Sequence, residues 1–326
     1  MFYSGTMDEQ NAMASPGRRG TRYHEQQAKT IVNAVKGMPF HWSVSPYRGC
    51  IHACTYCYAR ATHPFLGFDA GEDFEHEIVV KVNAPELLQR ELRHPRLRGQ
   101  TIIMGTVSDP YQPAEHRYRL TRQLLSILDG TGNPVGITTK STTVTQDVAL
   151  LSRMAARERI AVNLTITTLD PDLARMLEPR APSPMQRLAA LQHLADAGIP
   201  AGIFCAPILP GLTDDPDALE QLAAAVADHG GRWMMSGVLR IGDGFARPFL
   251  DAARRDFPQL VRRYERQAAR GFRGSASPDE VAAIQGRMDA IRARYDLQPG
   301  PPSRTTAPAA TQVSLPLMGV PAGLQR

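Results

Sequence analysis

The sequence has few cysteines, few aromatic residues and no long apolar run. Its 326 residues include four cysteines and two tryptophans, and aromatic residues make up 6% of the chain. Four cysteines, three of them within eight positions, do not suit a disulfide framework. Neither a membrane-spanning segment nor a signal peptide is recognisable. These absences argue against a disulfide-stapled secreted domain and a transmembrane protein, and they predict a cytoplasmic protein.

The charge balance is modest. Lysine and arginine (37) exceed aspartate and glutamate (32), which gives a formal net charge of +5. An excess of this size permits an acidic partner such as a nucleic acid but does not by itself indicate one. The length and the 43% apolar content suffice for one large α/β domain with tails.

The clustered cysteines carry the strongest motif. Residues 46–60 read P-Y-R-G-C-I-H-A-C-T-Y-C-Y-A-R, which places Cys50, Cys54 and Cys57 in a C-x3-C-x2-C spacing. A short loop with this spacing can turn three thiolates toward one centre, and thiolates are favoured ligands of iron and zinc. A closed structural site needs a fourth protein ligand. A four-iron cluster held by three cysteines instead leaves one iron open to bind another molecule.

Short β-like segments alternate with amphipathic helices after Phe40. The predicted strands span Trp42 to Ser45, Thr101 to Met104, Val135 to Thr138, Ala161 to Thr167, Ala201 to Ala206 and Trp233 to Leu239, with Ile78 to Lys81 as an extra edge strand. Such alternation indicates parallel strands joined by right-handed crossovers. We therefore predict an α/β core over residues 34–240, after a flexible leader over 1–33. A helical extension over 241–297 and a disordered tail over 298–326 would follow it.

Polar residues follow the predicted strands. Ser108 and Asp109 come after the second strand, Lys140 after the third, and Thr165 lies within the fourth. Working residues of parallel barrels lie at the carboxyl ends of strands, so we expect these four beside the cysteine loop. A turn cap, a solvated lysine and ordinary strand threonines remain the simpler interpretations of the same residues.

The C-x3-C-x2-C motif, with Tyr56 just before the last cysteine, resembles the signature of the radical S-adenosylmethionine (SAM) enzymes. With S-D-P-Y-Q-P-x-E, T-T-K, E-P-R-A-P-S-P-x-x-R-L and A-G-I-P-x-G-x-x-x-A-P-I-L-P-G-L-T-D, the chain is similar to the spore photoproduct lyase-like, or DNA repair photolyase-like, branch. The similarity covers roughly Lys36 to Leu239. It implies a partial (β/α)6 barrel, a 4Fe-4S cluster on the three cysteines and SAM on the open iron. It also implies lyase-like radical chemistry of the kind used in DNA repair, where the substrate is a DNA lesion.

The resemblance further assigns contacts to the cofactor. Tyr56 falls near the adenine, and Ser108, Lys140 and Thr165 match positions that contact SAM, with Thr165 in place of a serine. Asp109 and Arg187 are carried over as additional contacts. A cluster of this kind also implies a reductant such as flavodoxin or ferredoxin.

One position departs from this branch. Spore photoproduct lyase has a cysteine immediately before the serine that matches Ser108, and that cysteine returns a hydrogen atom to the substrate radical. This chain has Val107 there, which offers no S–H bond, so we do not expect it to split spore photoproduct. Cys205 is a candidate substitute, but a lone strand cysteine is more often a core residue.

The last third of the chain is basic. Helices are predicted over Pro248 to Arg270 and Pro278 to Tyr295. The arginines of the first helix form either a lid for a nucleic acid or, as we favour, a solvated face paired with carboxylates. Near the end, Q-V-S-L-P-L resembles the peptide by which bacterial repair proteins bind the sliding clamp, with Gln312, Leu315 and Leu317 as anchors. A tail segment that packs on its own domain is the alternative.

Two other functions stay open. One is a noncatalytic, zinc-dependent nucleic-acid-binding module, in which His52 or His63 completes a three-cysteine zinc site. The other is a radical SAM enzyme that acts on a protein or a small metabolite. Iron and sulfide content would separate the zinc module from the enzyme, whereas the residues themselves do not specify a substrate.

Overall fold

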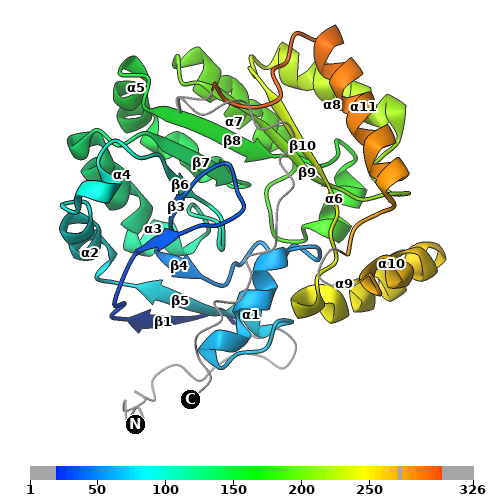
Figure 1. Cartoon of the computed structure of the whole chain (residues 1–326), viewed down its shortest axis with the longest axis horizontal. Coiled ribbons are helices and arrows are strands. Elements are labelled where there is room, and N and C mark those ends of the chain that lie inside the picture. The colour runs from blue at the N-terminus through cyan, green and yellow to red at the C-terminus, as the bar shows by residue number, and fades with distance from the viewer. Residues whose placement is uncertain (1–19, 271–273, 303–326) are drawn as a thin grey trace.

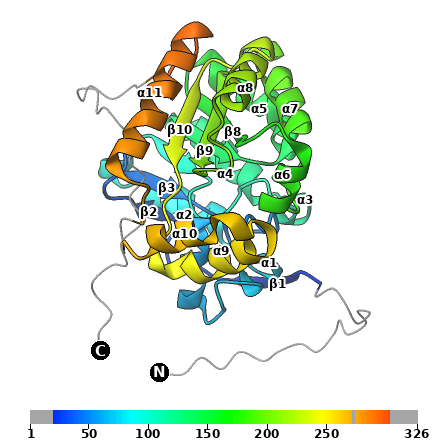
Figure 2. The same cartoon turned by 90° about the vertical axis from the view of Figure 1, so that its right-hand side faces the viewer.

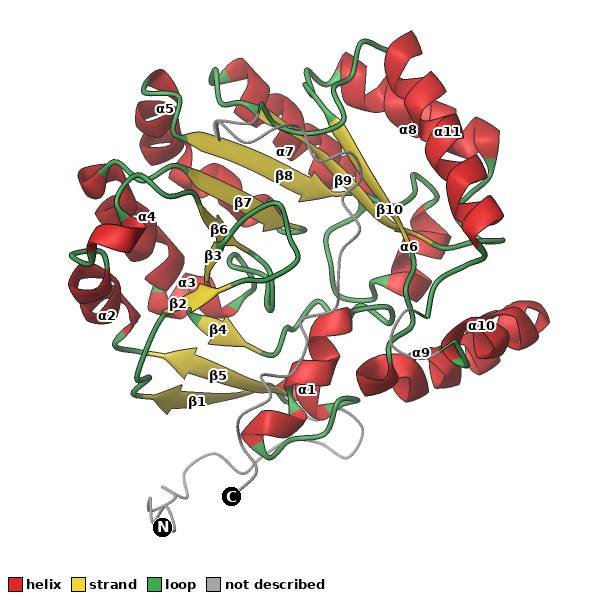
Figure 3. Ribbon diagram, in the orientation of Figure 1, coloured by secondary structure: helices red, strands yellow, loops and turns green. Residues whose placement is uncertain are grey.

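The computed structural model describes residues 20–270 and 274–302. Its centre is a seven-stranded sheet in the order β10-β9-β8-β7-β6-β3-β2. The strands form an arc with helices along its outer side (Figures 1 and 3). The parallel strands are β3 (Trp42–Val44), β6 (Ile102–Met104), β7 (Val135–Thr139), β8 (Ile160–Thr165), β9 (Ala201–Ile208) and β10 (Met234–Val238). The six main predicted strands are confirmed, with small shifts at their ends, and the sheet is the predicted partial barrel.

Helices connect the parallel strands and bury an apolar face against them. They are α2 (Ala84–Glu91), α3 (Ala114–Tyr118), α4 (Leu120–Thr131), α5 (Val148–Ala156), α6 (Pro171–Leu177), α7 (Pro184–Asp196) and α8 (Pro216–Asp228). The Ser183 hydroxyl caps α7 in a capping box with Gln186, and Asp215 caps α8. Leu124, Leu151 and Leu222 belong to the core between these helices and the sheet.

A second, three-stranded sheet contains the first part of the described chain. In it β1 (Arg22–Gln26) runs parallel to β5 (Glu77–Lys81), and β4 (Tyr47–Arg48) pairs antiparallel with β5. The short helix α1 (Asp73–His76) leads directly into β5. The strand predicted at the edge, Ile78 to Lys81, is thus the central strand of this separate sheet. The leader predicted over 1–33 is also wrong in its second half, because β1 lies there and β2 (Val32–Ala34), paired antiparallel with β3, begins there.

The C-terminal helices differ from the prediction in two ways. They are α9 (Asp243–Asp256), α10 (Val261–Ala268) and α11 (Pro278–Arg294). The single helix predicted up to Arg270 is two helices, because Phe257 leaves the helical conformation with a φ of −139° and Pro258 then begins a short 3-10 turn. Ile284, Met288 and Ile291 of α11 join the main core, and α11 contacts β10 and α8. The helix therefore belongs to the barrel rather than to a separate extension (Figure 2).

Two arginines near the end of α9 have acidic partners. Arg254 pairs with Asp251 and Glu265 at 2.8 Å each, and Arg255 pairs with Asp256 at 2.7 Å. For these two side chains the predicted solvated face is confirmed. The peptide with Gln312, Leu315 and Leu317 lies outside the described residues. Within residues 20–270 and 274–302, no helix is both long and apolar enough to cross a membrane.

Gly105 has a conformation that other residues do not tolerate well. It follows β6 with a φ of +99°, and a Cβ atom there would lie 2.0 Å from the carbonyl oxygen of Thr138. We expect Gly105→Ala to reduce the free energy of unfolding by about 2 kcal/mol, because strain and a backbone clash add. The reduction is measured as a lower urea midpoint. Gly286→Ala is the control, since nothing lies within 4 Å of its Cβ position and alanine favours helix α11. Equal midpoints for the two variants would contradict this account.

Candidate active site

One cavity of about 190 Å³ lies between the cysteine loop and the carboxyl ends of β6, β7 and β8. Its polar side includes Cys50, Cys54, Tyr56, Cys57, Ser108, Asp109, Lys140 and Thr165. Its apolar side includes Val35, Met38, Phe40, Phe204, Pro207 and Val238. The structure thus brings together every residue predicted for the site except Arg187.

Two left-handed backbone positions shape the cysteine loop. Gly49 has a φ of +76°, and a Cβ atom there would lie 2.9 Å from the Glu77 carbonyl oxygen. Ala53, between the first two cysteines, has a φ of +58°. The N–H groups of Ala53 and Cys57 donate to the carbonyl oxygens of Cys50 and Cys54, each at 3.3 Å. The loop therefore folds into consecutive tight turns, and its three thiols all line the cavity.

Residues after the last cysteine support this loop. Nε of Arg60 donates to the Cys54 carbonyl oxygen at 3.0 Å, and its Nη1 donates to that of Gly71 at 2.8 Å. The hydroxyl of Tyr58 donates to the Thr106 carbonyl oxygen after β6. The Y-A-R part of the motif therefore fixes the backbone that presents Cys54.

Ser108 and Gln112 join the loop after β6 to the cysteine loop. The Ser108 hydroxyl donates to the Gly49 carbonyl oxygen at 2.6 Å and accepts from Nε2 of Gln112 at 2.8 Å. Oε1 of Gln112 accepts from the N–H of Ile51 at 3.2 Å, and the side chain is fully buried. The sequence prediction did not assign Gln112, although it lies in the S-D-P-Y-Q-P-x-E motif.

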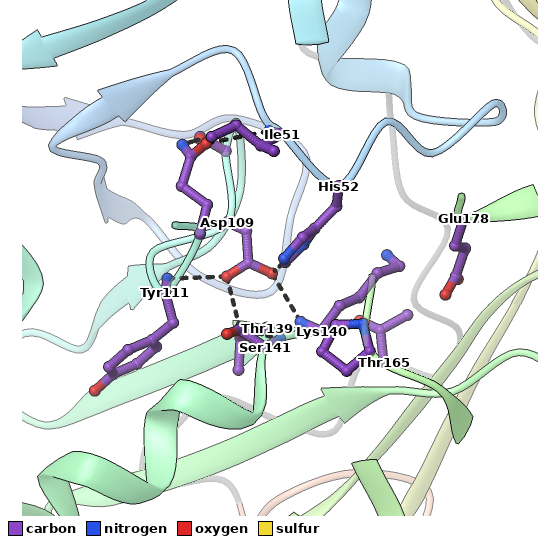
Figure 4. Close-up of polar contacts among 12 residues, drawn as sticks. Ile51, His52, Asp109, Tyr111, Thr139, Lys140, Ser141, Thr165 and Glu178 are labelled. Atoms are coloured by element: carbon purple, nitrogen blue, oxygen red, sulfur yellow. Dashed lines mark hydrogen bonds and ion pairs between the residues drawn. The ribbon is translucent and has the colours of Figure 1, made fainter. Parts of the chain in front are cut away.

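Asp109 connects the same loop to the end of β7 (Figure 4). Its Oδ1 accepts from the Thr139 hydroxyl at 2.6 Å and from the N–H of Tyr111 at 2.9 Å. Its Oδ2 accepts from the N–H of Lys140 at 2.7 Å and lies 3.3 Å from Nδ1 of His52. Burial alone would raise the pKa of Asp109, but His52 and these hydrogen bonds outweigh it and lower the pKa to about 2. Both oxygens are already engaged, which favours a positioning role over the predicted cofactor contact.

Asp109→Ala is expected to loosen this connection. The change leaves His52 buried without its partner and removes three hydrogen-bond acceptor contacts, so we expect a loss of about 2 kcal/mol in unfolding free energy. Urea unfolding measures it. Asp172→Ala is the matched control, because that carboxylate is 75% exposed and pairs only with a surface arginine. Equal stability of the two variants would rule out the positioning role.

Lys140 extends from the end of β7 into the cavity. Its Nζ lies 5.4 Å from the centroid of the Tyr56 ring. In the part of the chain that the structure describes, this ammonium forms no hydrogen bond or salt bridge with another side chain. Burial alone would lower the pKa of Lys140, but Cys54 and Glu178 outweigh it and raise the pKa. The cavity therefore contains a charged lysine that can accept an anionic partner.

A buried ion pair lies next to Tyr56 and Thr165, outside the cavity lining. Nη2 of Arg187, on α7, pairs with Oε2 of Glu178, and its Nη1 donates to the Thr165 carbonyl oxygen at 2.8 Å. The Tyr56 hydroxyl donates to Oε1 of Glu178. Arg187 does not line the cavity, so it supports β8 from behind rather than facing a ligand. The sequence prediction missed Glu178, although this residue begins the E-P-R motif.

Val107 and Cys205 differ in what they face. Val107 lines the cavity. Cys205 instead belongs to the main core and is fully buried, and burial raises its pKa to about 12. The prediction that Cys205 is a core residue is confirmed.

The arrangement of the thiols distinguishes between the metal sites considered above. Among the residues described, no three His, Cys, Asp or Glu side chains converge where a single metal ion could bind. His52 pairs with Asp109, and Nε2 of His63 lies 3.1 Å from the Asp73 carbonyl oxygen, so neither completes a zinc site here. The cysteines of a 4Fe-4S cluster bind different irons and need only face one cavity, as these three do. The donor set therefore fits the cluster.

Known proteins match most of the chain. The family model for the Radical SAM superfamily matches residues 44–223. An uncharacterized protein of Mycobacterium tuberculosis (strain ATCC 25618 / H37Rv) is 34% identical over 311 residues, which cover 93% of this chain and 91% of that protein. An uncharacterized protein of Methanocaldococcus jannaschii is 34% identical over 188 residues, covering 58% of this chain and 68% of that one. Among solved structures, spore photoproduct lyase complexed with dinucleoside spore photoproduct has a TM-score of 0.65 at 17% identity, covering 84% and 79% of the two chains. That last match is evidence of a shared fold.

Proposed function

The chain belongs to the radical SAM superfamily, whose members use a 4Fe-4S cluster and SAM, and on this basis we propose that the cavity under its cysteine loop is where a substrate loses a hydrogen atom. The observation that carries the proposal is that three thiols and a charged lysine line one cavity. Cys50, Cys54 and Cys57 hold the cluster. Together the two cofactors supply reductive cleavage of SAM, with an electron from a protein reductant, and abstraction of hydrogen from the substrate.

The other residues of the cavity hold the cofactor and exclude water. The Lys140 ammonium pairs with the carboxylate of SAM, because partial burial of a lysine charge is favourable only when an anion lies beside it. Thr165 and Ser108 border the same space, and the Tyr56 ring forms its wall beneath Lys140. Asp109, which lines the cavity, and Arg187, which does not, act through the contacts that fix β7 and β8.

A nucleic acid lesion is the substrate class that we propose. Spore photoproduct lyase, which shares the fold, has been solved with a dinucleoside lesion bound. The apolar side of the cavity, with Phe40 and Phe204, suits a flat base, because aromatic side chains stack on bases. Val107 argues against spore photoproduct itself. Among the described residues that line the cavity, the only thiols are those assigned to the cluster, so no spare thiol returns a hydrogen atom.

Product analysis under anaerobic conditions tests this function. The protein is reconstituted with iron and sulfide, reduced with dithionite and given SAM, and 5′-deoxyadenosine is quantified. We expect SAM cleavage without substrate, and faster cleavage with an ultraviolet-irradiated oligonucleotide than with the same oligonucleotide left unirradiated. No cleavage under any condition contradicts the radical function. Cleavage that irradiated DNA does not stimulate contradicts only the lesion, and favours a protein or metabolite substrate.

A further inference from the structure

We infer that residues 177–180 form a clamp, meaning a segment that holds the cysteine loop in place by hydrogen bonds. Within it, Glu178 neutralises Arg187, so that Lys140 presents the positive charge beside Tyr56 in the cavity. The inference rests on the proposed assignment of the cluster to the three cysteines. It gives a positioning role to Glu178, a residue outside the cavity lining.

The clamp contacts the cysteine loop on both sides of Cys54. The N–H of Thr55 donates to the Leu177 carbonyl oxygen at 2.9 Å, and the N–H of Arg180 donates to that of His52 at 3.4 Å. Between these backbone contacts, the Tyr56 hydroxyl donates to the Glu178 carboxylate. The Thr55 hydroxyl also donates to the Leu177 carbonyl oxygen at 3.3 Å, so four hydrogen bonds join the clamp to residues 52–56, which carry the second cysteine.

The charges of Glu178 and Arg187 are buried and paired with each other. Glu178 is 2% exposed and Arg187 is 1% exposed, and the two form a salt bridge. The Lys140 ammonium lies over the Tyr56 ring, whose hydroxyl donates to Glu178, and Glu178 appears with Lys140 and Thr165 on one side of Asp109 in Figure 4. With Glu178 ionised, Arg187 adds no net charge next to the cysteines. Without that carboxylate, a buried arginine would stand uncompensated beside Thr165 and Tyr56.

Two substitutions separate the two functions of Glu178. Glu178→Gln keeps an oxygen that accepts from Tyr56 but removes the negative charge, whereas Glu178→Ala removes both. For Glu178→Ala we expect iron to be lost to a chelator roughly tenfold faster than from the wild-type holoprotein, in the range of other outer-shell changes at metal sites. Unchanged iron loss would overturn the positioning role of Glu178 in the clamp.

Glu178→Gln should retain its iron but raise the reduction potential of the cluster, because an added positive charge favours the reduced form. The potential is measured by an electron paramagnetic resonance redox titration without SAM, so the readout does not depend on activity. The double variant Glu178→Gln/Arg187→Met restores the charge balance and should return the potential toward the wild-type value. Glu86→Gln, an exposed substitution on α2, is the control and should not shift it.

The outcomes distinguish this inference from the proposed function. If the wild-type protein assembles no 4Fe-4S cluster, the proposed function fails. If it assembles one and Glu178→Gln leaves the potential unchanged, only the charge role of Glu178 fails. A shift that the double variant does not reverse would also overturn that role, because the shift would not then arise from Arg187.

Discussion

Cys54→Ala is expected to abolish cluster assembly and SAM cleavage together. Two thiols would remain of the three that line the cavity, and two thiolates are too few to hold a four-iron cluster that already has one iron without a protein ligand. The fold should survive, because the loop at this position is fixed through the backbone: the Cys54 carbonyl oxygen accepts from Arg60 at 3.0 Å. We expect 5′-deoxyadenosine formation to fall by more than roughly 100-fold, since even outer-shell changes at metal sites cost 10- to 100-fold.

Cys205→Ala is the matched control, because the chain offers a fourth cysteine outside the cavity. It removes a thiol from the main core, so we expect a loss of about 1 kcal/mol in unfolding free energy and normal iron and product. Iron and sulfide per protein, the visible absorption of the cluster and 5′-deoxyadenosine are measured on both variants. Full iron content in Cys54→Ala, or equal loss in Cys205→Ala, would refute the ligand assignment.

The strands and the position of the site could be predicted from the sequence because both depend on local pattern. Short β-branched and apolar runs bounded by turns mark β6 to β10, and parallel topology then places Ser108, Lys140 and Thr165 at the same end of the sheet. The three cysteines could be recognised as a candidate ligand set from their spacing alone. These features are encoded within a few residues of one another.

The partners of each side chain could not be predicted in the same way. Tyr56 binds Glu178 across 122 positions, and Gln112 binds Ile51 across 61. A carboxylate at the end of a strand can face a ligand or another loop, and sequence pattern does not say which. Asp109 lines the cavity as a ligand contact would, but its oxygens also bind His52 and the end of β7.

Element order explains the errors in domain boundaries. β1 reads R-Y-H-E-Q, a polar strand without the alternation that marks a half-buried sheet, so the sequence pattern does not distinguish it from a flexible leader. The sequence pattern of α11 does not mark a clear apolar face, and α9 and α10 separate the helix from its partner β10 along the chain. An amphipathic stripe predicts that a helix packs, not where.

Lys140→Met is expected to weaken SAM binding by roughly 100-fold while leaving the cluster in place. Methionine has a similar length and keeps the contact with the Tyr56 ring, but it removes the charge that we assign to the SAM carboxylate. Hydrogen bonds to charged groups contribute about 1.5–3 kcal/mol each, which sets this magnitude. The backbone N–H of Lys140, which donates to Asp109, is unaffected, so the end of β7 keeps its place.

Equilibrium binding of SAM to the reconstituted protein, followed by the change in the cluster spectrum, measures the effect. Lys29→Met is the control, because that lysine is exposed and lies outside the cavity lining. Its SAM affinity should match the wild type. If Lys140→Met binds SAM normally, the lysine does not hold the carboxylate. If it loses iron as well as SAM, Lys140 instead stabilises the cysteine loop through Tyr56, and its ammonium is a structural element rather than a cofactor contact.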